Sequence, residues 1–177
     1  TVIVYKLLKK MNIFFSREIA LALITGIYND TGGMQHSNTI QETFEIVGDL
    51  AQYNVNIQEI VRPLFKTSTV SQLKLWGHIL ENVRINEKKV VSAVVTDDAL
   101  NTLGAQSGDT GGIVDLLNTI PDAKFTVLLA EDGGVVKGSL RTQREDVNVS
   151  DIASPFGGGG HAKASGFRVQ GRLGKEI

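Results

Sequence analysis

The sequence has no cysteine, which excludes disulfide bonds and thiolate metal sites. Histidine is also scarce, with three residues in 177, so a metal site would depend mainly on Asp and Glu. The longest apolar run, residues 19–27, is far shorter than the roughly 20 residues that span a bilayer. The first residues do not follow the signal-peptide pattern, because the lysines come after the apolar residues. We therefore expect a soluble, cytoplasmic protein without a membrane anchor.

The net charge is only −1, but the charges are unevenly distributed. Residues 1–136 contain 11 Lys and Arg against 15 Asp and Glu, whereas residues 137–177 contain 7 against 4. A basic C-terminal segment in a nearly neutral chain indicates an anionic ligand that is bound at one site. A long nucleic-acid-binding surface is less consistent with this pattern. Chance scatter in so small a sample is the alternative explanation.

The first 85 residues have helical periodicity. Ser16 suits the N-cap of a helix over residues 17–28, residues 39–42 match a capping box, and Asn56 suits a further N-cap. Helical spacing predicts the buried faces of three later helices as Ile40, Phe44, Val47 and Ala51; Ile57, Val61, Leu64 and Phe65; and Val70, Leu73, Trp76 and Leu80. The last of these helices has polar flanks, which suggests a junction between two lobes.

From Lys89 onward the pattern changes to short β-branched runs with turn signals between them. The predicted elements are a strand over 90–96, helices after Asp97 and after Asp109, strands over 125–130 and 135–140, a helix over 149–153 and a strand over 165–169. Residues 131–134 end in two glycines, a strong hairpin signal. The predicted fold class is α/β, a helical lobe followed by a small α/β lobe with a mixed β-sheet.

Four consecutive glycines, Gly157, Gly158, Gly159 and Gly160, stand directly before His161. Ordering four glycines costs conformational entropy, so a folded protein needs a reason to keep them. Positive φ angles would let successive N–H groups converge on an anion, and His161 could add a charge-assisted hydrogen bond. Arg141, at the end of a predicted strand, could present a bidentate fork to the same anion. The pattern predicts a phosphate-binding loop, with a merely flexible loop as the alternative.

The tetrapeptide Asp-Thr-Gly-Gly occurs twice, beginning at Asp30 and at Asp109. Aspartic proteases carry two Asp-Thr-Gly triplets whose carboxylates share a proton, but in an all-β setting. Here Asp30 follows a predicted helix and Asp109 precedes one, so we exclude a protease and expect Asp109 to be an N-cap. Asp30 is either a ligand for a hard metal ion or, as is more common at such positions, a turn residue.

The chain resembles a known family. Residues 138–141, 147–153, 157–161 and 164–166 resemble the DHH-associated (DHHA) domain of the DHH phosphoesterases. The resemblance is greatest to the nanoRNase type, oligoribonucleases that also act as phosphatases on 3′-phosphoadenosine 5′-phosphate. Residues 26–32, with Asn38 and Thr39, resemble the fourth motif of the DHH catalytic domain. The implied domains are the C-terminal part of a DHH catalytic domain (1–67), a linker helix and junction (68–88) and a DHH-associated substrate-binding domain (89–177).

The resemblance also implies roles for individual residues. Asp30 would be one ligand of a two-manganese site, and the substrate's phosphates would be held by Arg141, Gly157, Gly158, Gly159, Gly160 and His161, with help from Ser139 and Asn148. The family's first three motifs are absent and would lie before Thr1, where the sequence begins abruptly without Met. We therefore expect a C-terminal fragment that binds substrate but is inactive alone.

The implied substrates are short single-stranded oligonucleotides or nucleoside 3′,5′-bisphosphates, hydrolysed by the intact manganese-dependent enzyme. One alternative is a non-catalytic nucleic-acid or nucleotide-binding module, since the same domain occurs in alanyl-tRNA synthetases. Another is a phosphohydrolase for cyclic-dinucleotide products or polyphosphate. A homodimer is compatible with the sequence.

Overall fold

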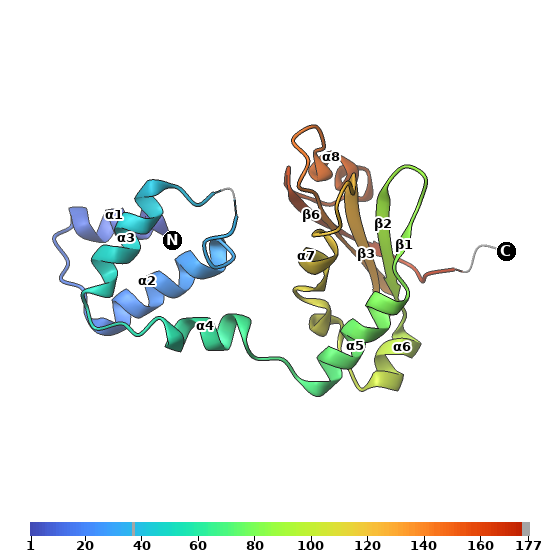
Figure 1. Ribbon diagram of the computed structural model, residues 1–177, viewed down its shortest axis with the longest axis horizontal. Coiled ribbons are helices and arrows are strands. Elements are labelled where there is room, and N and C mark those ends of the chain that lie inside the picture. Colours follow the sequence, from blue (N-terminus) through green and yellow to red (C-terminus); the bar gives the residue numbers. More distant parts are fainter. Residues whose placement is uncertain (37, 175–177) are drawn as a thin grey trace. The chain divides into compact units, whose positions relative to one another are not determined.

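The structure is a computed structural model that describes residues 1–36 and 38–174. It divides the chain into two compact units, Thr1–Thr67 and Ser68–Ile177 (Figure 1). The division falls just before helix α5 (Val70–Glu81), so this helix, expected at a junction, belongs to the second unit.

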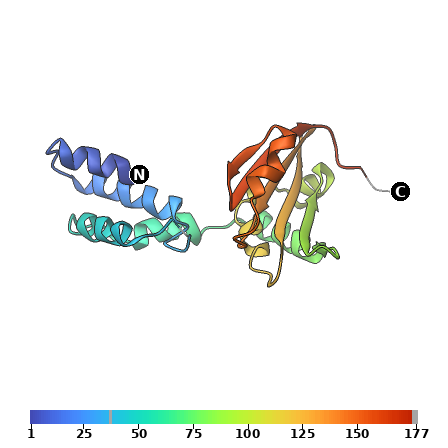
Figure 2. The same ribbon diagram turned by 90° about the horizontal axis from the view of Figure 1, so that it is seen from above.

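The first unit is helical (Figure 2). Its helices are α1 (Val2–Lys10), α2 (Arg17–Asp30), α3 (Gln41–Ala51) and α4 (Gln58–Phe65). Helix α2 supplies much of the core, because Ala20, Leu23, Ile24 and Ile27 are all buried. Ser16 is its N-cap as predicted, and the Ser16 hydroxyl accepts a hydrogen bond from the Ile19 N–H at 3.3 Å.

Helix α3 differs from the prediction in both its start and its buried face. It begins at Gln41, and the Thr43 hydroxyl accepts a hydrogen bond from the Ile40 N–H at 3.2 Å. The buried residues are Thr43, Ile46 and Leu50, whereas Phe44 is 57% exposed. The predicted face was wrong because this helix has two apolar stripes, and packing against α2 selects one of them.

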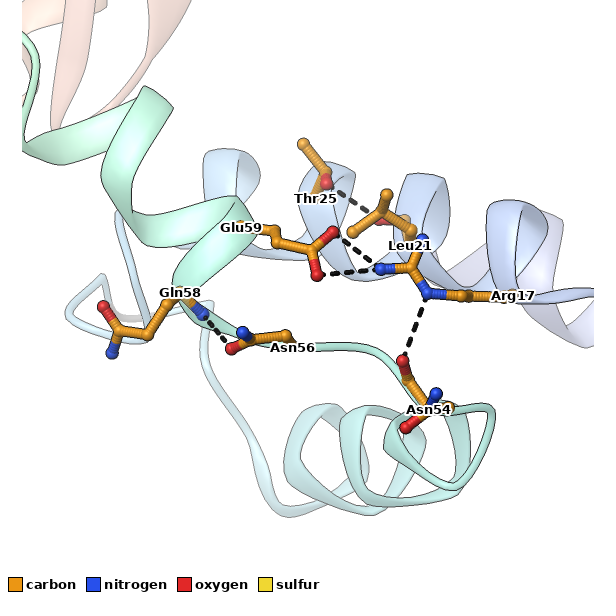
Figure 3. A network of polar contacts seen from close by, with 7 residues as sticks. All are labelled: Arg17, Leu21, Thr25, Asn54, Asn56, Gln58 and Glu59. Atoms are coloured by element: carbon orange, nitrogen blue, oxygen red, sulfur yellow. Dashed lines mark hydrogen bonds and ion pairs between the residues drawn. The ribbon is translucent and has the colours of Figure 1, made fainter.

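Polar contacts connect the beginning of α4 to α2 (Figure 3). The Arg17 guanidinium donates two hydrogen bonds to the Glu59 carboxylate, at 2.7 and 2.8 Å, and one to the Asn54 carbonyl at 3.2 Å. The Asn56 side chain accepts a hydrogen bond from the Gln58 N–H at 3.0 Å, but the N-cap position of α4 is Ile57, one residue later than predicted. These contacts fix where α4 starts.

The second unit is built on a six-stranded mixed sheet with the strand order β1-β2-β3-β4-β6-β5. Its strands are β1 (Arg84–Ile85), β2 (Val90–Val95), β3 (Phe125–Asp132), β4 (Val135–Arg141), β5 (Gly159–His161) and β6 (Ala164–Gln170). Strands β2 and β3 are parallel, and every other neighbouring pair is antiparallel. The parallel pair is joined through α6 (Asp97–Leu103), the 3₁₀ helix η1 (Ser107–Thr110) and α7 (Ile113–Leu117).

Helices cover the two faces of this sheet unequally. Helices α5, α6 and α7 pack on one face, mainly over β2 and β3, and that core contains Leu75, Ile79, Val91, Ala93, Val95, Leu100, Ile113, Val114, Leu117, Leu128 and Ala130. Helix α8 (Val149–Ala153) packs on the other face, where the core contains Leu140, Val147, Val149 and Ala153. Among the described residues, the first face therefore has no helix packed over β6 and β5.

Helix α5 is amphipathic, but its predicted buried face was wrong. Leu75 and Ile79 are fully buried in the second unit, whereas Val70 and Leu73 are more than half exposed. Trp76 is half-buried, and its indole N–H donates a hydrogen bond of 3.0 Å to the backbone carbonyl of Asp109. The helix is thus a core element of the second unit.

The hairpin between β3 and β4 is as predicted. Gly133 and Gly134 form its turn with φ angles of +60° and +91°, a conformation that suits glycine at both positions. The turn sets the β3–β4 register, in which Thr126 lies opposite Arg141 and Leu128 opposite Ser139. This register determines which β4 side chains reach the partly uncovered face.

Candidate functional site

Strands β4, β6 and β5 bring residues from distant parts of the sequence onto one face of the sheet. Residues that are directly opposite in an antiparallel pair point to the same side. Three rows therefore run across these strands: Arg141, Ala164 and His161; Ser139, Gly166 and Gly159; and Lys137 and Arg168. We call this surface the open face.

The first row places two of the predicted ligand-binding side chains on either side of a small residue. Arg141 and His161 both neighbour Ala164 in the register, so their Cα atoms are about 10 Å apart, two strand spacings. His161 is exposed, and Ala164 places only a methyl group between the two long side chains. An anion between them could be contacted from both sides.

The Arg141 guanidinium is already oriented by protein contacts. Its Nε atom donates a hydrogen bond of 2.7 Å to the Asp115 carboxylate on α7, and Nη1 donates one of 3.0 Å to the Leu140 carbonyl. Within residues 1–36 and 38–174, Nη2 has no hydrogen-bond partner, and the side chain is 28% exposed. Asp115 therefore fixes the group without occupying all of its donors.

The glycine run does not form the predicted series of positive φ angles. Among its four glycines, only Gly157 and Gly160 have positive φ, +71° and +146°, and Gly159 begins strand β5. A Cβ atom on Gly158 would overlap the Gly166 carbonyl oxygen, and one on Gly160 would lie 2.6 Å from the Ala164 carbonyl oxygen. Close approach of this chain segment to β6 is therefore what requires glycine here.

A pocket of about 450 Å³ adjoins the second and third rows. It is lined by Lys137, Gly138, Ser139, Gly157, Gly158, Gly166, Phe167 and Arg168. Half of these residues are glycines, so backbone forms much of the surface. Ser139 and the glycine run, both predicted from the sequence, meet here with two basic residues that the site prediction did not include.

Lys137 and Arg168 lie opposite each other on β4 and β6. The Lys137 ammonium donates a hydrogen bond of 3.0 Å to the Ser107 hydroxyl and forms an ion pair with Asp132. Hydrogen bonds from Lys137 and then Ser107 hold the pKa of the Asp132 carboxyl below its ordinary value. Arg168 is exposed. The alternation of side chains along β6, with Gly166 and Arg168 on one side, was the sequence signal that could have identified it.

A stacked pair of aromatic rings supports the pocket. The Phe156 and Phe167 ring centroids are 4.6 Å apart with an interplanar angle of 26°. The Phe167 ring lies where a Cβ atom on Gly138 would be, which explains the glycine in the middle of β4. The stack therefore packs the 3₁₀ helix η2 (Ser154–Phe156), which precedes the glycine run, against the sheet.

Asn148 has a structural role at the start of α8. Its side-chain oxygen accepts a hydrogen bond of 3.0 Å from the Ser150 N–H and so caps α8. Helix α8 packs on the opposite face of the sheet. The structure thus brings Arg141, His161, Ser139 and the glycine run onto or beside one face. Asn148 stands next to the β5–β6 turn, because the Val149 N–H donates a hydrogen bond of 2.9 Å to the Ala162 carbonyl.

The other two aspartates singled out from the sequence make local contacts. Asp30 is the last residue of α2, and its carboxylate accepts a hydrogen bond of 2.8 Å from the Thr1 hydroxyl. The Asn38 side chain donates one of 3.0 Å to the Asp30 carbonyl. Asp109 lies in η1, not at the N-cap of α7, and its carboxylate accepts a hydrogen bond of 2.8 Å from the Gln106 N–H.

The described residues do not fit a two-manganese site. In residues 1–36 and 38–174, no three His, Asp or Glu side chains are grouped so that they could hold a metal ion. Asp30 alone offers one carboxylate, whereas two bound ions need several ligands each. No helix in this part of the chain is long and apolar enough to cross a membrane.

Known proteins share both the sequence pattern and the fold. The family model of the DHHA1 domain matches residues 86–176. The bifunctional oligoribonuclease and PAP phosphatase NrnA of Bacillus subtilis is 28% identical over 83% of this chain and 46% of that protein. Its namesake in Thermus thermophilus is 30% identical over 93% of this chain and 49% of that protein. The A-adding tRNA nucleotidyltransferase of Aquifex aeolicus is 31% identical over 96% of this chain and 20% of that protein.

The crystal structure of an exopolyphosphatase-related protein from Bacteroides fragilis superposes with a TM-score of 0.88 and 28% identity. The superposition covers 97% of this chain and 51% of that one. The chain thus spans about half the length of the NrnA proteins and of this solved structure. The DHHA1 match covers more than half of the chain, and the predicted α/β fold with its mixed sheet is confirmed. The chain belongs to the DHHA1 domain family, and its similarity to the NrnA proteins agrees with the predicted resemblance to the nanoRNase type.

Proposed function

We propose that the open face binds the terminal phosphate of a short oligonucleotide or nucleotide and so supplies the substrate-binding part of a cytoplasmic phosphoesterase. The observation that carries this proposal is the row of Arg141, Ala164 and His161, which puts a guanidinium and an imidazole on either side of a small residue. The names of the NrnA relatives, oligoribonuclease and PAP phosphatase, support ligands of this class.

The chemistry of the row suits a phosphate group. The Nη2 atom of Arg141 has no hydrogen-bond partner within the described residues and can donate to phosphate oxygens. His161 can donate from the other side of Ala164, most strongly when it is protonated. Ser139, in the next row, can offer its hydroxyl to a neighbouring oxygen of the ligand.

We further propose that Asp30 serves as one manganese ligand only where a longer chain provides the others. The carboxylate at the end of α2 is exposed and can be reached, but it is a single ligand. These 177 residues would then bind substrate without hydrolysing it. Hydrolysis of a 5′-phosphorylated dinucleotide by this chain, in the presence of Mn²⁺ and at a rate near that of a full-length relative, would contradict this part of the proposal.

The phosphate-binding role is tested by isothermal titration of a 5′-phosphorylated dinucleotide into wild type, Arg141→Ala and Arg84→Ala. We expect Arg141→Ala to weaken binding about tenfold or more, because charge-assisted hydrogen bonds are lost. Arg84 is exposed on β1 at the opposite edge of the sheet and serves as the matched control. Equal affinities of all three proteins would overturn the proposal.

A second candidate is a non-catalytic nucleic-acid-binding module within a longer enzyme. It is favoured by the 31% identity to the A-adding tRNA nucleotidyltransferase of Aquifex aeolicus, which extends over 96% of this chain. A competition experiment separates the two candidates. A tRNA 3′ end and an unstructured oligonucleotide of the same terminal sequence are each used to displace the bound dinucleotide. Far better displacement by the tRNA 3′ end would favour the nucleic-acid-binding module.

A further inference from the structure

We propose that Arg168, with Lys137, forms a second phosphate subsite on the open face, which makes an oligonucleotide the preferred ligand over a mononucleotide. The proposal rests on the proposed function, because it takes the row of Arg141 and His161 as the site of the terminal phosphate. It adds where the next part of the ligand lies and which residue recognises it.

The placement of the two basic residues follows from the sheet. Lys137 is four residues before Arg141 on the same strand, so it lies on the same face about 13–14 Å away along β4. Arg168 stands beside Lys137 on β6, and both line the pocket of about 450 Å³ together with Ser139. The two ends of the open face therefore each carry an arginine.

The charges at the end of the open face that carries Lys137 and Arg168 favour the binding of an anion. Lys137 is positioned by the Ser107 hydroxyl and by Asp132, the carboxylate that lies closest to it. Asp132 offsets one positive charge, so Lys137 and Arg168 together leave about one in excess. Arg168 has no hydrogen bond or ion pair within the described residues, and its exposed guanidinium is the group available to a ligand.

The surface between the two ends is nearly free of long side chains. Its middle row consists of Ser139, Gly166 and Gly159. A ligand that lies along β4 can therefore stay close to the sheet from the Arg141 end to the Arg168 end. The Ser139 hydroxyl stands midway and can contact the ribose or a phosphate of such a ligand.

The distance between the Arg141 end and the Arg168 end of the open face determines which class of ligand can contact both. A nucleoside monophosphate carries one phosphate and can occupy only one end. A nucleoside 3′,5′-bisphosphate holds its two phosphates on a single ribose, which is a short span. A 5′-phosphorylated trinucleotide offers a series of phosphates along an extended backbone, and this ligand can reach both arginines.

The experiment is a length series on the full 177-residue chain. Dissociation constants are measured by isothermal titration for adenosine 5′-monophosphate, 3′-phosphoadenosine 5′-phosphate and a 5′-phosphorylated triadenylate. The proteins are wild type, Arg168→Ala, Arg168→Lys, Arg141→Ala and the control Arg84→Ala. We expect wild type to bind the trinucleotide at least tenfold more tightly than the monophosphate.

We expect Arg168→Ala to remove most of this length dependence while it changes the affinity for the monophosphate less than twofold. Arg168→Lys should restore part of it, because the charge remains but the bidentate fork is lost. Equal wild-type affinity for all three ligands, or the same loss in Arg168→Ala for the monophosphate and the trinucleotide, would overturn the subsite alone. An Arg141→Ala protein that binds every ligand like wild type, or no binding at all, would overturn the proposed function and the subsite with it.

Discussion

The two units of the chain position their candidate functional residues in different ways. In the first unit, Asp30 is placed by the end of one helix, and the described residues contain no group of three His, Asp or Glu side chains that could hold a metal ion. In the second unit, strand register brings Arg141, His161 and Arg168 onto one face, although they are up to 27 positions apart in the sequence. A helix end positions one residue, whereas a sheet can bring several side chains onto one face within a single unit.

The difference also appears in how each site is supported. Asp115 and Leu140 fix the Arg141 guanidinium, and Ser107 and Asp132 fix the Lys137 ammonium. The Asp30 carboxylate has the Thr1 hydroxyl as its neighbour. We therefore expect ligand binding to depend on the second unit. The following variants test how far the two units also differ in stability and in metal binding.

The largest effect is expected from Leu50→Ala in the first unit. Leu50 is fully buried, and truncating a buried leucine costs about 3 kcal/mol of unfolding free energy. Trp76, the single tryptophan, lies in the second unit, so its fluorescence monitors that unit alone, whereas far-ultraviolet circular dichroism monitors both. We expect the circular dichroism transition in denaturant to acquire an earlier phase while the fluorescence transition stays unchanged.

Phe44→Ala is the control for Leu50→Ala. It removes a larger side chain that is 57% exposed, so it should leave both transitions close to those of wild type. A parallel shift of the fluorescence and circular dichroism transitions in Leu50→Ala would show that the two units unfold together.

A loss of about 1–3 kcal/mol of unfolding free energy is expected from Gly158→Ala, because the new methyl group would overlap the Gly166 carbonyl. The matched control is Gly159→Ala in the same glycine run, where an added Cβ atom meets nothing within 4 Å. Denaturant unfolding monitored by Trp76 fluorescence gives both values. If the two variants are equally stable, steric approach to β6 is not what requires Gly158.

Glu131→Gln is expected to cost about 2 kcal/mol at neutral pH. The buried Glu131 carboxylate accepts hydrogen bonds from the Asp97 N–H at 2.8 Å and the Leu173 N–H at 2.7 Å, which hold its pKa below the ordinary value. This stabilisation is complete above the unfolded-state pKa of about 4.3 and is lost as the pH falls through the lower pKa of the folded state.

The gap in unfolding free energy between wild type and Glu131→Gln should therefore narrow when unfolding is measured at successively lower pH. Glu87→Gln, at an exposed position, should show no such gap. A gap that stays constant down to pH values where wild-type Glu131 is protonated would contradict the role of its charge.

The smallest effect concerns Mn²⁺ and Asp30. Because the described residues hold no group of metal ligands, we expect wild type and Asp30→Asn to leave the same electron paramagnetic resonance signal of free Mn²⁺. A loss of this signal with wild type that the Asp30→Asn variant abolishes would show that the first unit does hold a metal ion.

Local chemistry explains which elements the sequence predicted well. The Ser16 cap and the Gly133–Gly134 turn depend on residues within a few positions of each other, and both formed as expected. The buried faces of α3 and α5 were wrong because each helix carries two apolar stripes, and packing partners distant in the sequence select between them. Strand β5 was missed, since a glycine run has no strand propensity and only pairing with β6 makes it a strand.

The candidate site, like the helices and strands, could be predicted in part from the sequence. Motifs pointed to Arg141, His161, Ser139 and the glycine run, and the structure places these residues on or beside one face. Arg168 and the Phe156–Phe167 stack depend on the β4–β6 register, which no single stretch of sequence contains. Asn148, included through its motif, turned out to cap α8.

The glycine run packs closely against β6, and this packing affects the kinetics of ligand binding. Strand β5 is hydrogen-bonded in place, and Gly158 has no room to shift toward Gly166, so the surface is shaped before any ligand arrives. Association should then be a single encounter without a subsequent closing step. In stopped-flow mixing, the observed rate should rise linearly with oligonucleotide concentration, without saturation, and should slow as salt screens the attraction between the ligand and the basic face.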